Sequence, residues 1–179
     1  TGVQTCALPI FTASLTDANG ALNGLVFTAN SNFVGTASVR IVTDDQGATG
    51  SGGSLTDDDT VSITVTEVND APTITPLADT RTDEDTEIGP LSFSVSDLET
   101  SADVLVVTAS SDDETLFDPA DFVLEGSGGD RTLRFTPQLD ATGDTWVRVR
   151  VQDEQGAAAS ASFVATVVPV DDAPVALSD

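Results

Sequence analysis

The stretch Val68-Asn69-Asp70-Ala71-Pro72 recurs as Val170-Asp171-Asp172-Ala173-Pro174, so the chain repeats itself with a period of 172 minus 70, or 102, residues. Upstream, Asp44-Asp45-Gln46-Gly47 matches Asp153-Glu154-Gln155-Gly156, and Leu25-Val26-Phe27-Thr28 matches Leu133-Arg134-Phe135-Thr136. The first copy carries a longer Gly/Ser/Asp loop at residues 48–59. Self-similarity of this kind indicates tandem modules, and about 100 residues suffice for a module with its own core.

The repeat predicts the domain organisation. We expect a complete module at residues 71–172, preceded by the C-terminal part of another module at 11–70 and followed by the start of a third at 173–179. The incomplete first module should expose apolar strand faces. Residues 1–10 resemble a translated sequencing adapter, and we interpret them as a non-native leader.

Two-residue alternation predicts strands with one buried and one wet face. Val147, Val149 and Val151 alternate with polar residues, and so do Leu91, Phe93 and Val95. The sequence therefore predicts an all-β fold of tandem Greek-key β-sandwiches. Trp146 is expected in the core, and Asp17-Ala18-Asn19-Gly20 is expected to be a turn. The seven predicted strands, lettered A to G in chain order, are 73–77, 90–96, 103–109, 121–125, 131–136, 145–152 and 160–168.

Charge and composition exclude several classes of function. Thirty acidic residues face six basic ones, all Arg, for a net charge of −24, which repels nucleic acid and anionic membranes. The chain has no His, no Lys and a single Cys, so a zinc cage, a Ser-His-Asp triad, a Walker loop and Schiff-base chemistry are excluded. No apolar run is long enough for membrane insertion. We expect no enzyme.

The acidic residues gather at the two ends of the predicted sandwich. Because successive strands alternate in direction, the BC, DE and FG loops share the end where the chain enters the module, and the AB, CD and EF loops share the other. This places Asp97, Glu99 and Asp153 beside the linker Glu67-Val68-Asn69-Asp70 at the N-terminal end. The C-terminal end gathers a second set, namely Asp83, Glu84, Asp85, Asp140, Asp171 and Asp172.

Strand parity adds a detail. Asp97 continues the inward series of Phe93 and Val95, and Asp153 continues that of the valines, so both carboxylates should tip over the end of the core. A carboxylate there is costly unless it is paired, and calcium accepts six to eight oxygen ligands. The spacing therefore predicts Ca²⁺ at each end. In the first copy Asp44, aligned with Asp153, falls out of phase with Val39 and Ile41.

The pattern resembles the cadherin-like and bacterial tandem immunoglobulin-like repeats of large surface adhesins, whose linkers read Val-Asn-Asp-Ala-Pro. The resemblance implies calcium ligands at Glu67, Asn69, Asp70, Asp97, Glu99 and Asp153 for the N-terminal junction, and at Glu84, Asp140, Asp171 and Asp172 for the C-terminal junction. Leu139-Asp140-Ala141-Thr142 lacks the glutamate of the matching cadherin motif, which favours one ion per junction.

The resemblance implies a calcium-binding structural repeat of a secreted or surface-anchored bacterial adhesin that rigidifies an extended stalk. Its partners would be neighbouring repeats of the same chain, with cell-surface proteins or glycans as ligands, and its place would be extracellular. Two alternatives stay open. One is a carbohydrate- or protein-binding β-sandwich, which exposed aromatic residues on one sheet would support, and the other is a metal-free spacer of a secreted hydrolase.

Overall fold

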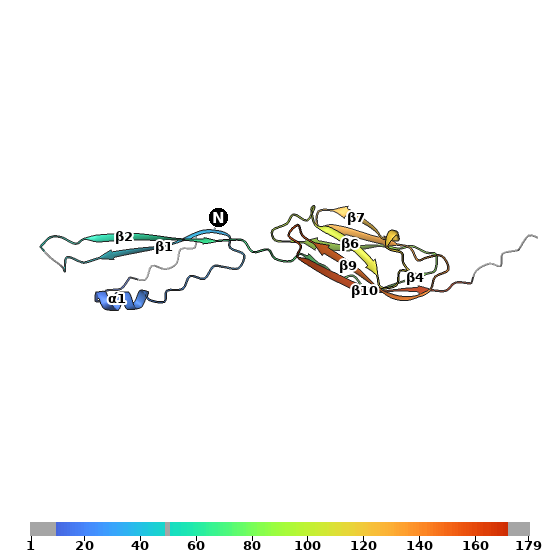
Figure 1. Cartoon of the computed structure of the whole chain (residues 1–179), viewed down its shortest axis with the longest axis horizontal. Helices are drawn as coiled ribbons and strands as arrows, with labels where there is room; N and C mark the ends of the chain where they lie inside the picture. The colour runs from blue at the N-terminus through green and yellow to red at the C-terminus, as the bar shows by residue number, and fades with distance from the viewer. Residues whose placement is uncertain (1–9, 49–50, 172–179) are drawn as a thin grey trace, which may run out of the picture. The chain divides into compact units, whose positions relative to one another are not determined.

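The computed structural model describes residues 10–48 and 51–171 (Figure 1). The chain divides into two compact units, Thr1–Glu67 and Val68–Asp179. The segments expected as a leader at 1–10 and as the start of a further module at 173–179 lie outside the described residues, apart from Ile10. None of the described helices is long and apolar enough to cross a membrane.

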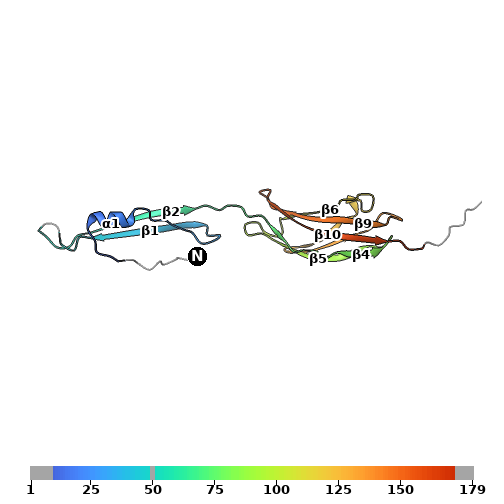
Figure 2. The same ribbon diagram turned by 90° about the horizontal axis from the view of Figure 1, so that it is seen from below.

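The C-terminal unit is a sandwich of two four-stranded sheets, which confirms the predicted all-β class. The first sheet has the order β3-β5-β8-β7 and the second has the order β4-β10-β9-β6. Strands β9 and β10 lie side by side in both views (Figures 1 and 2). The strands are β3 (Thr73–Ile74), β4 (Thr80–Asp83), β5 (Ile88–Ser96), β6 (Val106–Ser111), β7 (Val123–Ser127), β8 (Asp130–Phe135), β9 (Gly143–Gln152) and β10 (Ala158–Val168), with a short 3-10 helix, η1 (Pro119–Asp121), before β7.

The core lies between the sheets and follows the predicted parity. Val147, Val149 and Val151 of β9 are all 0% exposed, and Phe93 and Val95 of β5 are buried opposite them. Phenylalanine rings join the two layers, because Phe135 of β8 contacts Phe117 at 4.9 Å, Phe122 at 5.1 Å and Phe163 of β10 at 6.2 Å between ring centroids. Such ring pairs add specific geometry to the area they bury.

Only Thr73 and Ile74 of the first predicted strand, 73–77, form a strand, and β4 at Thr80–Asp83 lies beyond the predicted range. Strand β3 pairs antiparallel with β5, and the chain then crosses to the other sheet to form β4, which pairs in parallel with β10. No hydrophobic pattern predicts β4, because Thr80-Arg81-Thr82-Asp83 carries no apolar residue. Pairing with the long strand β10 outweighs that weak local preference.

The prediction that Trp146 lies in the core is wrong, since the residue is 53% exposed. Its neighbours Thr145 and Val147 are both buried. Thr145 can enter the core where β9 begins because its hydroxyl meets that of Ser111, 3.3 Å away. The alternation that buries the valines of β9 turns Trp146 outward.

The described part of the N-terminal unit holds one hairpin and one helix. Strands β1 (Gly35–Asp44) and β2 (Thr56–Val65) pair antiparallel in unbroken register, from Gly35 opposite Val65 to Asp44 opposite Thr56. None of the described residues of this unit is buried. Apolar side chains are exposed in both strands, including Val42 and Val61, as the sequence predicts.

Two local predictions for this unit are wrong. The expected turn at Asp17-Ala18-Asn19-Gly20 lies inside helix α1 (Leu15–Leu22), because Ser14 caps the helix by accepting a hydrogen bond from the Asp17 amide at 3.2 Å. Residues 25–28, matched in sequence to part of β8, form no strand. In the C-terminal unit β8 pairs with β5 and β7, and the described part of the N-terminal unit has no counterpart of either.

The phenylalanine cluster makes a first testable prediction. Replacing Phe135, 1% exposed, with Ala should lower the free energy of unfolding of the C-terminal unit by about 3–5 kcal/mol, whereas Phe135→Leu should cost about 1–1.5 kcal/mol. The measurement is urea unfolding followed by the fluorescence of Trp146, the only Trp, which reports on this unit alone. The control, Val123→Ala at an exposed site, should shift stability by no more than about 0.5 kcal/mol. Equal losses for Phe135→Ala and Val123→Ala would contradict the assigned core.

Candidate metal centre

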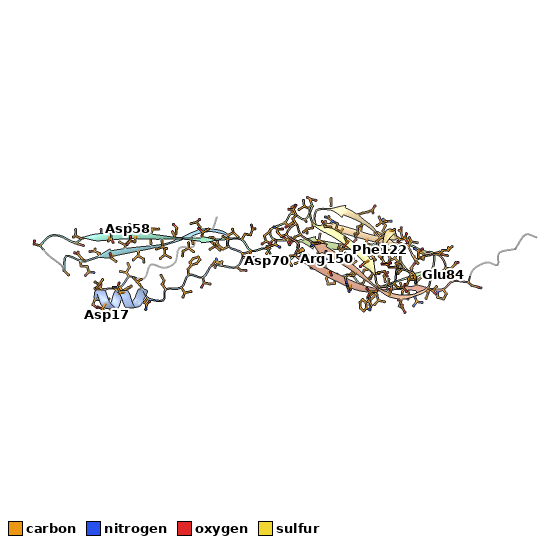
Figure 3. The ribbon with its side chains drawn as sticks, viewed as in Figure 1. Asp17, Asp58, Asp70, Glu84, Phe122 and Arg150 are labelled. Carbon is orange, nitrogen blue, oxygen red and sulfur yellow. The ribbon has the colours of Figure 1, made fainter. Side chains whose placement is uncertain are left out.

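Three loops and the linker converge at the N-terminal end of the C-terminal unit, as predicted. The BC loop joins β5 to β6, the DE loop joins β7 to β8, and the FG loop joins β9 to β10. The BC and DE loops meet where the Gly128 amide donates to Asp103 Oδ1 at 2.6 Å. The BC and FG loops meet where Thr100 Oγ1 lies 3.4 Å from Gln155 Oε1. Figure 3 labels Asp70 at this end of the unit and Glu84 at the opposite end.

Asp153 is a buried carboxylate, only 5% exposed, at the start of the FG loop. Its Oδ2 accepts a hydrogen bond from Asn69 Nδ2 at 2.8 Å, and its Oδ1 accepts one from the Ala157 amide at 2.8 Å. The hydrogen bond from Asn69 is the main cause that lowers the pKa of Asp153 below its ordinary value, against the opposing effect of burial. The carboxylate therefore stays ionised although it lies at the end of the core.

The linker is attached to the BC loop as well. The main-chain amide of Asp70 donates to Glu99 Oε2 at 3.2 Å. Asn69 and Asp70 thus join the linker to the FG loop and the BC loop, respectively. The structure brings together four of the predicted residues, Asn69, Asp70, Glu99 and Asp153.

Asp97 shapes the BC loop. Its Oδ1 accepts from the amides of Glu99 at 2.9 Å and Thr100 at 2.7 Å, so the side chain closes a turn directly after β5. Its other oxygen, Oδ2, is buried without a hydrogen-bond partner, and so is Oδ1 of Asn69. Two buried oxygens left unpaired at the same end of the sandwich are costly, because each has lost its water without a replacement.

The donor chemistry at this end fits a calcium ion. Asn69 Oδ1 and Asp97 Oδ2 are acceptors without a hydrogen-bond partner, and Asp153 adds an ionised carboxylate at the same end of the sandwich. Within the described ranges, however, no three His, Cys, Asp or Glu side chains are grouped so that they could hold a metal ion. Amide, main-chain and water oxygens would have to complete the shell, which calcium permits.

Glu67 is the last residue of the N-terminal unit and is exposed. It directly precedes Val68, with which the C-terminal unit begins. As a ligand it stays a prediction.

The C-terminal set lies around the turn between β4 and β5. Glu84 Oε1 accepts from the Val170 amide at 2.6 Å, and Asp85 Oδ1 accepts from the Asp140 amide at 3.1 Å. The AB turn therefore contacts both the EF loop and the segment after β10. Asp171 is exposed, and Asp172 lies outside the described residues.

The hairpin of the N-terminal unit contains a second residue with the geometry of Asp153, and it is Asp45 rather than Asp44. The Asp45 amide donates to Leu55 O at 3.1 Å and Asp45 Oδ1 accepts from the Leu55 amide at 2.8 Å. In the C-terminal unit the Asp153 amide donates to Ala157 O at 3.0 Å and Asp153 Oδ1 accepts from the Ala157 amide. Asp45 is also in phase with Val39 and Ile41, so the mismatch noted for Asp44 is an error of alignment by one residue.

The corrected alignment makes the repeat consistent. Asp153 minus Asp45 gives an offset of 108, which equals the offset between Leu25 and Leu133. The sequence alone could have matched Asp45 to Asp153, because Asp45 has the parity of Val39 and Ile41. The shared Gln-Gly of Gln46-Gly47 and Gln155-Gly156 instead favoured matching Asp44 to Asp153.

Comparisons with known proteins agree with this architecture. Residues 69–166 match the family described as Bacterial Ig domain. A comparison with curated protein sequences finds no match. Similar solved structures include a protocadherin, a desmocollin and a titin complex.

The extracellular cadherin domains 1–5 of protocadherin gamma B2 are 18% identical at a TM-score of 0.48, over 77% of this chain and 27% of that chain. The ectodomain of human desmocollin-1 is 16% identical at a TM-score of 0.43, over 77% of this chain and 28% of that chain. An immunoglobulin complex of titin and obscurin-like 1 is 17% identical at a TM-score of 0.43, over 59% of this chain and 100% of that chain.

The family match begins at the linker residue Asn69 and runs to Thr166 near the end of β10, so it covers the strands and loops that build the sandwich. It covers more than half of the 179 residues. The chain belongs to the bacterial Ig domain family.

Proposed function

We propose that the C-terminal unit is a calcium-binding structural repeat of a secreted or surface-anchored bacterial adhesin. Calcium held at its N-terminal end would fix the linker and so stiffen an extended stalk outside the cell, with no catalytic role. The observation that carries the proposal is the pair of buried, unpartnered oxygens, Asn69 Oδ1 and Asp97 Oδ2, at the end where Asp153 is also buried.

The proposed ligands come from three separate segments. Asn69 belongs to the linker, Asp97 and Glu99 to the BC loop, and Asp153 to the FG loop. An ion bound to all three would cross-link segments that are now joined by single hydrogen bonds. Bound calcium supplies a positive charge that offsets the repulsion between these carboxylates. It also coordinates the buried oxygens that have no hydrogen-bond donor in the fold.

The mechanical consequence follows from the linker. Few side chains of the linker pack against the sandwich. Val68 is exposed, and Pro72 is the only buried residue between Glu67 and Pro72. Fixing Asn69 to the BC and FG loops removes rotational freedom from the backbone just before the sandwich. A linker without calcium keeps that freedom and bends.

Calcium binding gives the first test of this proposal. At free calcium 100 times its dissociation constant, the C-terminal unit should gain about 2.7 kcal/mol, measured as a rise in the midpoint of thermal unfolding of the full chain. Asp97→Asn should weaken calcium affinity at least about tenfold, because it removes a charged ligand. The amide keeps an oxygen in the place of Oδ1 for the amides of Glu99 and Thr100, so the turn should survive.

The matched control is Glu114→Gln, which removes one negative charge from an exposed loop residue of the same unit. It should leave the calcium response unchanged. If the unmodified chain shows no response up to about 10 mM calcium, above the range of extracellular modules, the proposed site does not exist.

Stiffening makes a separate prediction for small-angle X-ray scattering. Calcium at millimolar concentration should narrow the distribution of distances within the full chain and extend its maximum, because the linker loses freedom. Magnesium at the same concentration should do less, since it prefers fewer protein ligands and stricter octahedral geometry. A thermal shift with calcium but an unchanged scattering curve would leave a local ion site and contradict the stiffening role.

The hydrogen bond between Asn69 and Asp153 predicts a pH dependence in the absence of calcium. Because the folded pKa of Asp153 is lowered, its contribution to stability is present above the ordinary value of 3.8 and is lost as the pH falls through the lower folded value. Asn69→Ala should therefore destabilise the unit at pH 7 and have a smaller effect in acid. Denaturant unfolding at several pH values, with the exposed-site variant Glu114→Gln as control, measures this difference. A destabilisation by Asn69→Ala that is equal at all pH values would show that the bond does not act on the charge of Asp153.

A further inference from the structure

The outward face of the β4-β10-β9-β6 sheet carries the only Trp of the protein. Trp146 is half exposed and lies opposite Val164 of β10. Together with Asp144 and Thr145 these residues line an open depression of about 380 Å³. A single exposed Trp needs no explanation by itself, so the inference rests on what lies beside it.

Two arginines continue the outward row of β9 beyond Trp146. Arg148 and Arg150 follow at two-residue spacing, so they share its face. Figure 3 labels Arg150, which belongs to β9. Arg148 lies between Ser162 of β10 and Ser110 of β6, and Arg150 lies between Ser160 and Thr108. Each guanidinium is therefore flanked by hydroxyl side chains.

Neither arginine has a carboxylate partner among the described residues, in a chain with five acidic residues for each Arg. Arg150 Nη1 donates instead to the amide oxygen of Gln152 at 2.7 Å. By contrast, Arg40 pairs with Asp58 and Arg134 with Glu87. Two of the six arginines thus stand together with guanidinium donors available to a ligand.

The other charged residues on this outward face lie apart from Arg148 and Arg150. Asp144, whose Oδ1 accepts from Thr166 Oγ1 at 2.5 Å, lies on the side of Trp146 away from the arginines. On β4, Arg81 is opposite Thr166 and Asp83 is opposite Val168. Along β9 the row therefore reads carboxylate, indole, guanidinium, guanidinium.

This order of groups suits a sugar chain with acidic residues. The indole face packs against the C–H face of a pyranose ring, and Asp144 and the Ser and Thr hydroxyls exchange hydrogen bonds with sugar hydroxyls. A guanidinium binds a carboxylate through two parallel N–H groups. From Trp146 to Arg150 the strand rises about 13 Å, a length suited to a short oligosaccharide.

We propose that the outward face of β9, from Asp144 to Arg150, binds an anionic polysaccharide that carries uronate carboxylates. The carboxylates lie on Arg148 and Arg150, and a neighbouring sugar stacks on Trp146. A nucleic acid fits less well, because its charges, one per about 1.7 Å of duplex, are too dense for two guanidinium groups to neutralise, and the remaining phosphates are repelled by the net charge of −24. The surface is separate from the proposed calcium ligands, and the binding requires no metal.

The test uses the full chain with EDTA present and a hyaluronan hexasaccharide as probe. Trp146 emission should change saturably as the sugar is added, because the protein has one Trp and no Tyr. The matched neutral probe, chitohexaose, should bind at least about tenfold more weakly, since it lacks the carboxylates that form charge-assisted bonds with Arg. Added salt should weaken the binding of hyaluronan.

Variants locate the site. Arg148→Gln with Arg150→Gln should weaken hyaluronan binding at least about tenfold, and Trp146→Ala, followed by calorimetry, should abolish it. Both changes are on an exposed face, and unchanged thermal unfolding serves as the folding check. The control for loss of an arginine charge elsewhere is Arg40→Gln in the N-terminal unit, which should bind like the unmodified chain.

Four outcomes would overturn the proposal: no saturable binding, equal binding of the neutral and acidic probes, unchanged binding after both arginines are removed, or equal loss in the Arg40→Gln control. Emission that changes with protein concentration in the absence of sugar would assign the face to a second copy of the chain and would overturn it as well. None of these results bears on the calcium proposal, because EDTA is present throughout.

Discussion

The alternation of side chains along β9 is the constraint on which the rest of this unit depends. One phase places Val147, Val149 and Val151 between the sheets, where they are fully buried, and delivers Asp153 to the end of the core. The opposite phase places Trp146, Arg148 and Arg150 on the outer surface. A shift of one residue in register would exchange the two sets, so the core, the candidate metal centre and the outer face are fixed by a single choice.

Much of the fold could be predicted because the strands follow this period closely. Parity in β5 and β9 correctly placed the core and tipped Asp153 inward, and direction alone brought the BC, DE and FG loops together. The expected burial of Trp146 was wrong, although the same alternation that buries Val147 turns its neighbour outward. Identity of two residues likewise outweighed phase when Asp44 was matched to Asp153 in place of Asp45.

The remaining errors come from interactions that are not written in a local pattern. Strand β4 forms because β10 offers it an edge, and helix α1 forms because Ser14 supplies a cap at a point where the sequence reads as a turn. The hydrogen bonds of the candidate metal centre could not be predicted from the sequence either. The linker and the loops are distant along the chain, and only the folded structure shows that Asn69 donates to Asp153 while its own side-chain oxygen has no hydrogen-bond partner.

The parallel pairing of β4 with β10 has a consequence for a chain under tension. Strand β4, near the start of the unit, is parallel to β10, its last strand, over four residue pairs from Thr80 opposite Ala165 to Asp83 opposite Val168. A force that pulls Val68 and Asp171 apart therefore drags these two strands in opposite directions along their common axis. Their hydrogen bonds are loaded together in shear, and they cannot be peeled open one at a time.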